Sequence, residues 1–258
     1  MVESEKGFIY LMLVEMTHGS NTYQFNTDNA ISIAITLHFN SQQPNHFGAE
    51  VATKTPLIGG EFIGDTKRGG SCNADSITLV PHCNGTHTET VNHIVHQKVP
   101  IGVHLSHGLS LCQLITVTPV KADDSTDNYL PELDSSDDVI DLSVLQSQLN
   151  QKQLDTIQSL VIRTLPNHET KKACVYDGQH QYPFFTLEAM SWLAESGIKH
   201  LLVDMPSVDK MYDDGQLSNH HIYWNVVPQS RLLNDESHTD RTITEMVFVD
   251  DKIEDGLF

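Results

Sequence analysis

Residue types that bind metals gather in one short stretch of the chain, residues 81–96, which reads PHCNGTHTETVNHIVH. His82, His87, Glu89 and His93 place imidazole and carboxylate donors within twelve residues of one another. A lone histidine is usually a surface or core residue, but four such donors at this spacing are far less often accidental. The stretch predicts a metal site, because histidine nitrogens and carboxylate oxygens are common ligands of zinc and related ions.

Two further features would position such a site. Ser76–Val80 (SITLV) predicts a strand that leads into the stretch, and Gly85 allows the backbone to turn back so that the donors converge. Far along the chain, Thr242–Val249 (TITEMVFV) predicts a strand that is apolar except at Glu245. A carboxylate in a buried strand must be paired, protonated or bound to a metal. We therefore expect Glu245 to contribute to the same site.

The rest of the chain alternates between predicted strands and helices, as in an α/β protein. Ser159–Arg163 (SLVIR) and His200–Asp204 (HLLVD) predict buried strands, and between them Thr186 caps a helix that Gly197 ends. A strand–helix–strand unit of this kind predicts parallel pairing with a right-handed crossover. The other predicted elements are strands at Ile31–Leu37 and Leu111–Val117, a helix at Leu142–Ile157, and irregular segments at Asn40–Gly70 and Asp123–Asp141.

The composition limits the classes of partner. The chain has 258 residues and a net charge of -19, with only 15 lysines and arginines. This balance argues against nucleic acid and against anionic membrane surfaces as partners, because both attract clustered basic residues. The four cysteines are scattered and form no CxxC pair, so we do not expect a disulfide framework. We expect a cytoplasmic location instead. The sequence also lacks the GxGxxG, P-loop and GxSxG motifs.

The core HCNGTHTETVNH resembles the signature of the cyclase-like metal-dependent hydrolases, which include bacterial kynurenine formamidase, isatin hydrolase and some dienelactone hydrolases. That signature is His-x-Gly-x-His-x-Asp-x-x-x-His. The chain matches it at Gly85, His87 and His93, and carries Glu89 in place of the aspartate. The segments GDTKRGGSCN, LVIRTLPN, HLLVDMPSVD, SNHHIYWN and TITEMVFVDD also resemble the family in the expected order. The resemblance runs from about Ile31 to the C-terminus.

The resemblance implies an α/β fold, a single domain with a central mixed β-sheet or partial barrel flanked by helices, of the swivelling β/β/α type. This domain would span residues 31–258, after an N-terminal extension or arm at residues 1–30. Family members usually continue with another strand and a tail, so the end at Phe258 is interpreted as a truncation or the loss of an edge strand.

The resemblance also implies roles for individual residues. His93 corresponds to the family's catalytic histidine, and Glu245 is expected to support catalysis as well as metal binding. An ungapped count back from His87 places the first ligand position at Cys83, whereas a one-residue bulge would give it to His82. We favour His82, and a Cys83 thiolate would favour zinc over manganese. The implied metal ligands are His82, His87, Glu89, His220 and Glu245.

The function implied by the resemblance is hydrolysis of a small amide, formamide or cyclic lactone or lactam. Metal-bound hydroxide would attack the carbonyl, one or two Zn or Mn ions would be the cofactor, and His93 would act as general acid and base. The alternative is an inactive metal- and ligand-binding protein, which the departures at Cys83 and Glu89 favour and the presence of His93 opposes.

The resemblance further implies a small-molecule substrate and a homodimer or homotetramer. The walls of a substrate pocket are expected from the segment Asn40–Gly70 and from four aromatic residues. Those aromatics are equally well interpreted as core residues. They are Phe184, Phe185, Tyr223 and Trp224.

Overall fold

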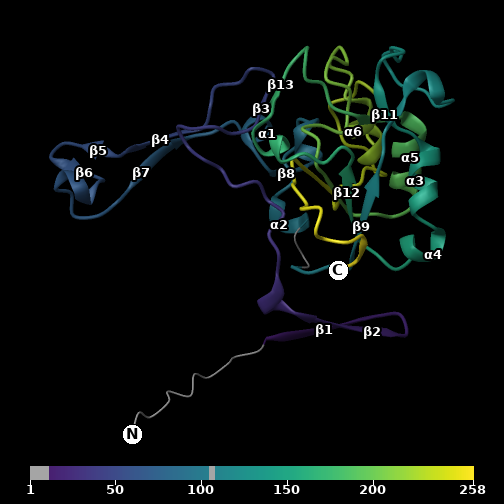
Figure 1. The fold of residues 1–258 in the computed structure, drawn as a ribbon, viewed down its shortest axis with the longest axis horizontal. Coiled ribbons are helices and arrows are strands. Elements are labelled where there is room, and N and C mark those ends of the chain that lie inside the picture. The colour runs from purple at the N-terminus through teal and green to yellow at the C-terminus, as the bar shows by residue number, and fades with distance from the viewer. Residues whose placement is uncertain (1–11, 105–107) are drawn as a thin grey trace, which may run out of the picture.

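A six-stranded mixed sheet forms the centre of the computed structural model, which describes residues 12–104 and 108–258 (Figure 1). The four inner strands run parallel, and an antiparallel strand lies at each edge. The chain therefore has the expected single-domain α/β fold with a mixed sheet. The order is β17 (Gly256–Leu257), β9 (Cys112–Val117), β12 (Ser159–Thr164), β15 (His200–Val203), β16 (Thr242–Glu245) and β8 (His87–Thr90).

Strand β12 is the most deeply buried part of this sheet, because both of its faces are covered. Leu160 and Ile162 belong to the main hydrophobic core, whereas Val161 belongs to a smaller cluster with Leu114 and Val249 on the other face. Parallel strands buried on both faces carry continuous apolar runs. The run SLVIR was therefore a sound basis for predicting a strand here, and its predicted parallel pairing with β15 is confirmed.

Helices α3 (Leu142–Gln148), α5 (Leu187–Glu195) and α6 (Ser218–Tyr223) pack together beside the sheet (Figure 1). Met190 and Leu193 of α5 are fully buried in the main core. The predicted cap of α5 is confirmed, since the Thr186 hydroxyl accepts a hydrogen bond from the amide of Ala189 at 3.2 Å. Among the described residues, no helix is long and apolar enough to cross a membrane.

Short elements complete the body around this sheet and helix layer. One three-stranded sheet consists of β10 (Val120–Lys121), β11 (Asp138–Ile140) and β14 (Phe184–Phe185). A further strand pair is formed by β3 (Asn45–His46) and β13 (Val175–Tyr176). Three short helices also belong to the body: α1 (Pro81–Asn84), α2 (Ile101–His104) and α4 (Gln151–Leu154).

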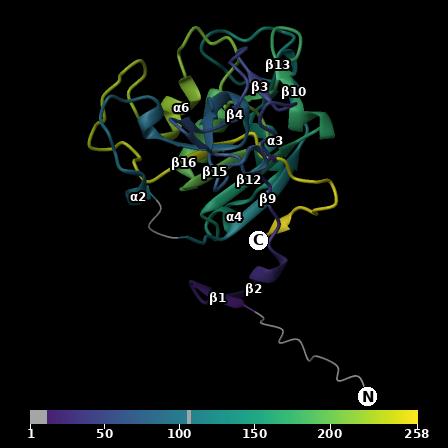
Figure 2. The same cartoon turned by 90° about the vertical axis from the view of Figure 1, so that its left-hand side faces the viewer.

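Two hairpin-like segments stand away from the body. The N-terminal hairpin of β1 (Leu13–His18) and β2 (Asn21–Asn26) lies below it in both views (Figure 2). An arm extends sideways from the body (Figure 1). This arm consists of β4 (Thr53–Pro56) paired with β7 (Asp75–Thr78), and β5 (Ile58–Gly59) paired with β6 (Phe62–Ile63).

Several predicted elements were wrong. Ile31–Leu37 makes only an isolated bridge, Ala34 to Val247. The amide of Ile35 donates to the Thr86 hydroxyl and not to a neighbouring strand. The predicted helix Leu142–Ile157 is two helices, because the chain leaves helical conformation at Leu149 and Asn150 then caps α4.

The arm and the end of the last parallel strand also differ from prediction. Asn40–Gly70 was expected to be irregular, but it supplies strands β3 to β6. The strand predicted at Ser76–Val80 is confirmed over Ser76–Thr78 by β7, and it lies exposed in the arm. Strand β16 ends at Glu245, because Met246 adopts a positive φ of 53° and turns the chain.

Candidate metal centre

The edge strand β8 and its inner neighbour β16 bring the first three candidate ligands together. Strands β8 and β16 pair antiparallel, with Glu245 directly opposite His87 and Ile243 opposite Glu89. Because side chains alternate along a strand, His87 and Glu89 share one face of β8. His87 Nε2 lies 3.3 Å from Glu245 Oε2, and both side chains are buried. The register of this single ladder therefore assembles half of the predicted site.

Glu89 occupies the centre of the cluster. Its Oε1 lies 2.7 Å from His220 Nε2, and its Oε2 lies 3.3 Å from His82 Nδ1. The same Oε2 is 3.6 Å from His93 Nδ1. All of the site residues predicted from the sequence are thus near one another, although their roles as ligands stay predictions.

Each histidine is held by a different local structure. His82 lies on α1, whose first residue, Pro81, suits the first turn of a helix. His93 ends a 3-10 helix (Val91–His93), where Asn92 bonds both the amide and the carbonyl of Val99. These short elements place the two imidazoles beside each other, both near Oε2 of Glu89.

His220 reaches the cluster from α6, which the neighbouring Asn219 anchors to two other segments of the chain. The side-chain amide of Asn219 donates to the carbonyls of Phe185 and Val208, each at 2.8 Å. The neighbouring His221 points elsewhere, since its Nδ1 lies 3.2 Å from the carbonyl oxygen of Val226. Of the two adjacent histidines, only His220 faces Glu89.

The donor set fits a divalent metal. Two groups of side chains have ligand atoms close enough to share an ion, His82 with Glu89 and His93, and His87 with Glu89 and Glu245. His87 Nε2 and Glu89 Oε2 are buried and make no hydrogen bond to any described residue. Buried polar atoms are rarely left without a hydrogen bond or a metal. Imidazole nitrogen and carboxylate oxygen are suitable ligands of zinc or manganese.

His87 is oriented to present the ring nitrogen that lacks a partner. Its Nδ1 lies 3.0 Å from the carbonyl oxygen of Gly85, an acceptor only, so Nδ1 carries the proton and Nε2 keeps its lone pair. Gly85 itself is in extended conformation. Its contribution is therefore the carbonyl, not the backbone freedom expected from the sequence.

His82 and Cys83 differ in their placement relative to the two donor groups. His82 belongs to one of the two donor groups, and Cys83, also within the described chain, belongs to neither. Burial raises the pKa of the Cys83 thiol, which opposes formation of the thiolate that binds metals. The observed arrangement favours His82.

The two central carboxylates have opposite electrostatic character. Burial would raise the pKa of Glu89, but the charge of His220, the hydrogen bond from His220 and the close approach of His82 lower it strongly. Burial and the charge of Glu89 together raise the pKa of Glu245. Opposed pKa values in adjacent carboxylates are typical of functional sites.

His93 is suited to accept a proton. Burial is the main cause that lowers its pKa to about 4; the charge of Glu89 opposes this shift, and the neighbouring histidines add to it. The imidazole is therefore neutral at pH 7. Its side chain is 28% exposed, whereas those of Glu89 and His220 are 3% and 2% exposed, so His93 can meet a molecule that enters from solvent.

Sequence reasoning missed two polar groups beside the site. Asp209 lies behind His220, with Oδ2 2.5 Å from His220 Nδ1. His46 is buried, lies 3.2 Å from the Tyr182 hydroxyl, and has its pKa lowered to about 4 by burial and by His87. Neither residue has metal-ligand spacing in the sequence, and only the fold brings them to the cluster.

The four aromatic residues expected as pocket walls or as core are all core residues. Phe185, Tyr223 and Trp224 are fully buried in the main cluster, and Phe184 is buried with Tyr129 and Val139. Trp224 still borders the site, since its ring centroid lies 5.4 Å from that of His220.

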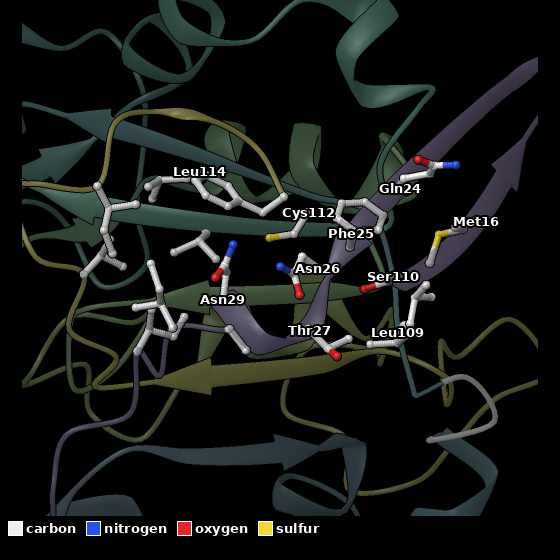
Figure 3. A pocket seen from close by; sticks show the side chains of 18 residues that line it. Met16, Gln24, Phe25, Asn26, Thr27, Asn29, Leu109, Ser110, Cys112 and Leu114 are labelled. Atoms are coloured by element: carbon white, nitrogen blue, oxygen red, sulfur yellow. The ribbon is translucent and has the colours of Figure 1, made fainter. Parts of the chain in front are cut away.

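An apolar cavity of about 590 Å³ lies apart from the cluster, between the N-terminal hairpin and the sheet. Met16 and Phe25 of the hairpin and Cys112 and Leu114 of β9 are among its lining residues (Figure 3). None of the predicted ligands lines it. The cavity is therefore not part of the candidate metal centre.

Comparisons with known proteins agree with this architecture. Residues 16–210 match the model of the family named Cyclase. Among solved structures, a potential metal-dependent hydrolase with cyclase activity is 13% identical, with a TM-score of 0.51 over 88% of this chain and 86% of that one. The fold is therefore that of this neighbour. No curated protein matches the chain significantly.

Two further solved structures are more distant. A predicted metal-dependent hydrolase from Bacillus stearothermophilus is 11% identical, with a TM-score of 0.47 over 96% of this chain and 88% of that one. An isatin hydrolase bound to a product analogue, thioisatinate, is 13% identical, with a TM-score of 0.43 over 80% of this chain and 72% of that one.

Proposed function

The chain belongs to the cyclase family, and on that premise we propose that it is a metal-dependent hydrolase of a small amide, formamide or cyclic lactone or lactam. The observation that carries the proposal is the convergence of two groups of donors on the buried Glu89, one from each side. The solved neighbours named as metal-dependent hydrolases, and as isatin hydrolase, support the choice of reaction class.

The ligands proposed for one or two Zn or Mn ions are those gathered around Glu89. A bound ion of this kind polarises a carbonyl group and makes water acidic enough to act as a nucleophile near neutral pH. Glu89 belongs to both donor groups, with Oε2 toward His82 and His93 and Oε1 toward His220, so it is the candidate to serve both. The proposed ligands are His82, His87, Glu89, His220 and Glu245.

His93 is the proposed general acid and base. With Nδ1 toward Glu89, its Nε2 is the nitrogen that would take the proton from the attacking water. The oxygen of that water bonds to the carbonyl carbon, the carbon–nitrogen or ester carbon–oxygen bond breaks, and His93 returns the proton to the leaving atom. Glu245, buried beside His87, supports the same region with its Oε1 fixed by the amide of Val208 at 3.0 Å.

One experiment tests the proposal directly. The purified protein is analysed for bound metal and then assayed, loaded with Zn²⁺ or Mn²⁺, on N-formylkynurenine, isatin and simple lactones. We expect turnover of at least one class that chelation abolishes. A metal-loaded protein that hydrolyses no member of a broad amide and lactone panel would contradict the proposed reaction, and would favour the inactive binding protein.

We also propose that the protein is a homodimer or homotetramer, and the arm supports this. Isolated two-stranded hairpins are marginally stable in water. The arm nevertheless exposes large apolar side chains, with Ile58 and Ile77 each 59% exposed and Leu57 47% exposed. A second copy of the chain covering the arm would remove this apolar surface from water.

A cytoplasmic location is proposed from the cysteines. All four lie within the described residues and all are free, including the exposed Cys72. Free thiols persist in a reducing compartment, whereas oxidising compartments favour their pairing.

A further inference from the structure

His220 lies between two carboxylates, one on each ring nitrogen. Its Nε2 is 2.7 Å from Glu89 Oε1, and its Nδ1 is 2.5 Å from Asp209 Oδ2. The His220 side chain is 2% exposed and that of Asp209 is 1% exposed. Water therefore cannot supply the hydrogen bond that Asp209 makes, so this pair decides how the ring is oriented.

Asp209 is itself held in place by donors on its other oxygen. The Tyr129 hydroxyl and the amide of Asn219 both donate to Oδ1, each at 2.7 Å. The Tyr129 hydroxyl in turn accepts from the amide of Lys210 at 3.0 Å. With two donors committed to Oδ1, the other oxygen, Oδ2, is turned toward His220, whose backbone amide also donates to it at 3.4 Å.

We propose that Asp209 is a positioning residue that keeps a proton of His220 on Nδ1, so that Nε2, which faces Glu89, is the nitrogen left for the metal. An ionised carboxylate only accepts hydrogen bonds, so Nδ1 beside Asp209 carries a proton, and the proton that Nε2 shares with Glu89 is the one that a metal would replace. Ligating histidines are commonly fixed in this way by a carboxylate on the other nitrogen. The inference rests on the proposed metal site, of which His220 is a member.

The change Asp209→Asn tests the tautomer with little change in side-chain volume. Tyr129 and Asn219 both donate, so the amide oxygen of the new side chain is expected to turn toward them. Its NH₂ group then faces His220 Nδ1 and donates to it. The ring would then keep a proton only on Nε2, where it points at Glu89 and blocks the nitrogen that a metal would use.

Two measurements follow on the full chain labelled with ¹⁵N-histidine, with His220 assigned by comparison with His220→Gln. In chelator, the Nδ1 resonance of wild type is expected in the protonated range, and that of Asp209→Asn in the unprotonated range. Zinc affinity, measured by competition with a chromophoric chelator, is expected to fall about 10–100-fold.

The matched control is Asp141→Asn, another buried aspartate that accepts several hydrogen bonds but lies at the start of α3. It is expected to alter neither the His220 resonance nor zinc affinity. An unchanged Nδ1 resonance in Asp209→Asn, or an equal loss of zinc affinity in Asp141→Asn, would overturn the inference. If wild type binds no zinc, the proposed function fails, while the resonance still reports on Asp209.

Discussion

His87 and Glu245 lie opposite each other on the edge strand β8 and its inner neighbour β16, with Nε2 and Oε2 3.3 Å apart in a setting closed to solvent. They come from distant parts of the chain, so the contact exists only because β8 pairs with β16. The geometry of the site therefore depends on the antiparallel register at this edge of the sheet. Any change that shifts this register by one residue would move His87 to the other face.

We expect Glu245→Gln to lose metal while it keeps its fold. The amide oxygen of glutamine can still accept from the amide of Val208, but the negative charge beside His87 is removed. Loss of a direct ligand should weaken zinc binding by more than the ~10–100-fold typical of outer partners. Metal content and chelator competition measure this.

The control for that variant is Glu188→Gln, whose carboxylate accepts hydrogen bonds from Asn128 at the start of α5. It carries the same chemical change away from the site and should retain full metal content. Wild-type zinc affinity in Glu245→Gln would show that Glu245 is not a ligand.

His82 and Cys83 can be separated by single alanine substitutions. We expect His82→Ala to lower metal content, because His82 Nδ1 lies 3.3 Å from the central Glu89. Cys83→Ala should keep the metal, since Cys83 is buried and lies outside both donor groups. The reverse result, measured by metal analysis of both variants, would return the first ligand position to the thiolate.

His93→Gln should separate catalysis from binding. General acid–base residues typically contribute about 10²–10⁴-fold, so we expect kcat to fall by that amount with metal content unchanged. His96→Gln is the control, because it lies three residues further on and outside both donor groups. If His93→Gln instead loses metal, His93 is a ligand, as its place beside His82 and Glu89 would allow.

Local sequence patterns predicted most of the parallel sheet but could not predict its edges. The apolar runs at β9, β12 and β15 are buried on both faces, so their composition alone reports their environment. The arm has no such signal. Strand β7 was predicted from Ser76–Val80, but β4 carries threonine and lysine in the open, and the glycine- and proline-rich surroundings of β4 to β6 predicted irregular structure.

The candidate site divides in the same way. The histidines and Glu89 of residues 81–96 could be found because metal-ligand spacing is local. Glu245 could be found because a carboxylate is out of place in an apolar strand. Asp209 has neither signal, since it acts through His220 from a segment that looks like an ordinary turn. Its role depends on a hydrogen bond that only the packed fold creates.

The arm gives a prediction for the oligomeric state. The double variant Ile58→Glu with Ile77→Glu places charges on the exposed apolar surface of the arm. We expect a lower mass by light scattering after size exclusion, because burying these carboxylates in an interface would be costly. Val227→Glu, at a residue 58% exposed outside the arm, should not change the mass. A wild-type chain that is monomeric at all concentrations would contradict the proposed assembly.

The adjacent lysines Lys171 and Lys172 are expected to differ strongly in their contribution to stability. Lys171 Nζ lies 2.7 Å from Asp204 Oδ2, and the Asp204 side chain is 1% exposed. Lys172 pairs with Glu169 at 2.6 Å, and both of these side chains are exposed. Removing one partner of a buried pair costs about 3–5 kcal/mol, whereas an exposed pair contributes about 0–1 kcal/mol.

Urea unfolding of Lys171→Met and Lys172→Met therefore tests this difference in stability. At pH 7 we expect the free energy of unfolding to fall mainly in Lys171→Met. Burial raises the pKa of Asp204 and Lys171 opposes that rise, so the pKa rises further when Lys171 is removed. A carboxyl whose folded pKa exceeds its unfolded value loses stability as pH rises through that interval. The deficit of Lys171→Met should accordingly shrink in acid, where Asp204 is neutral. Equal losses in the two variants at pH 7 would show that the buried pair contributes no more than the exposed one.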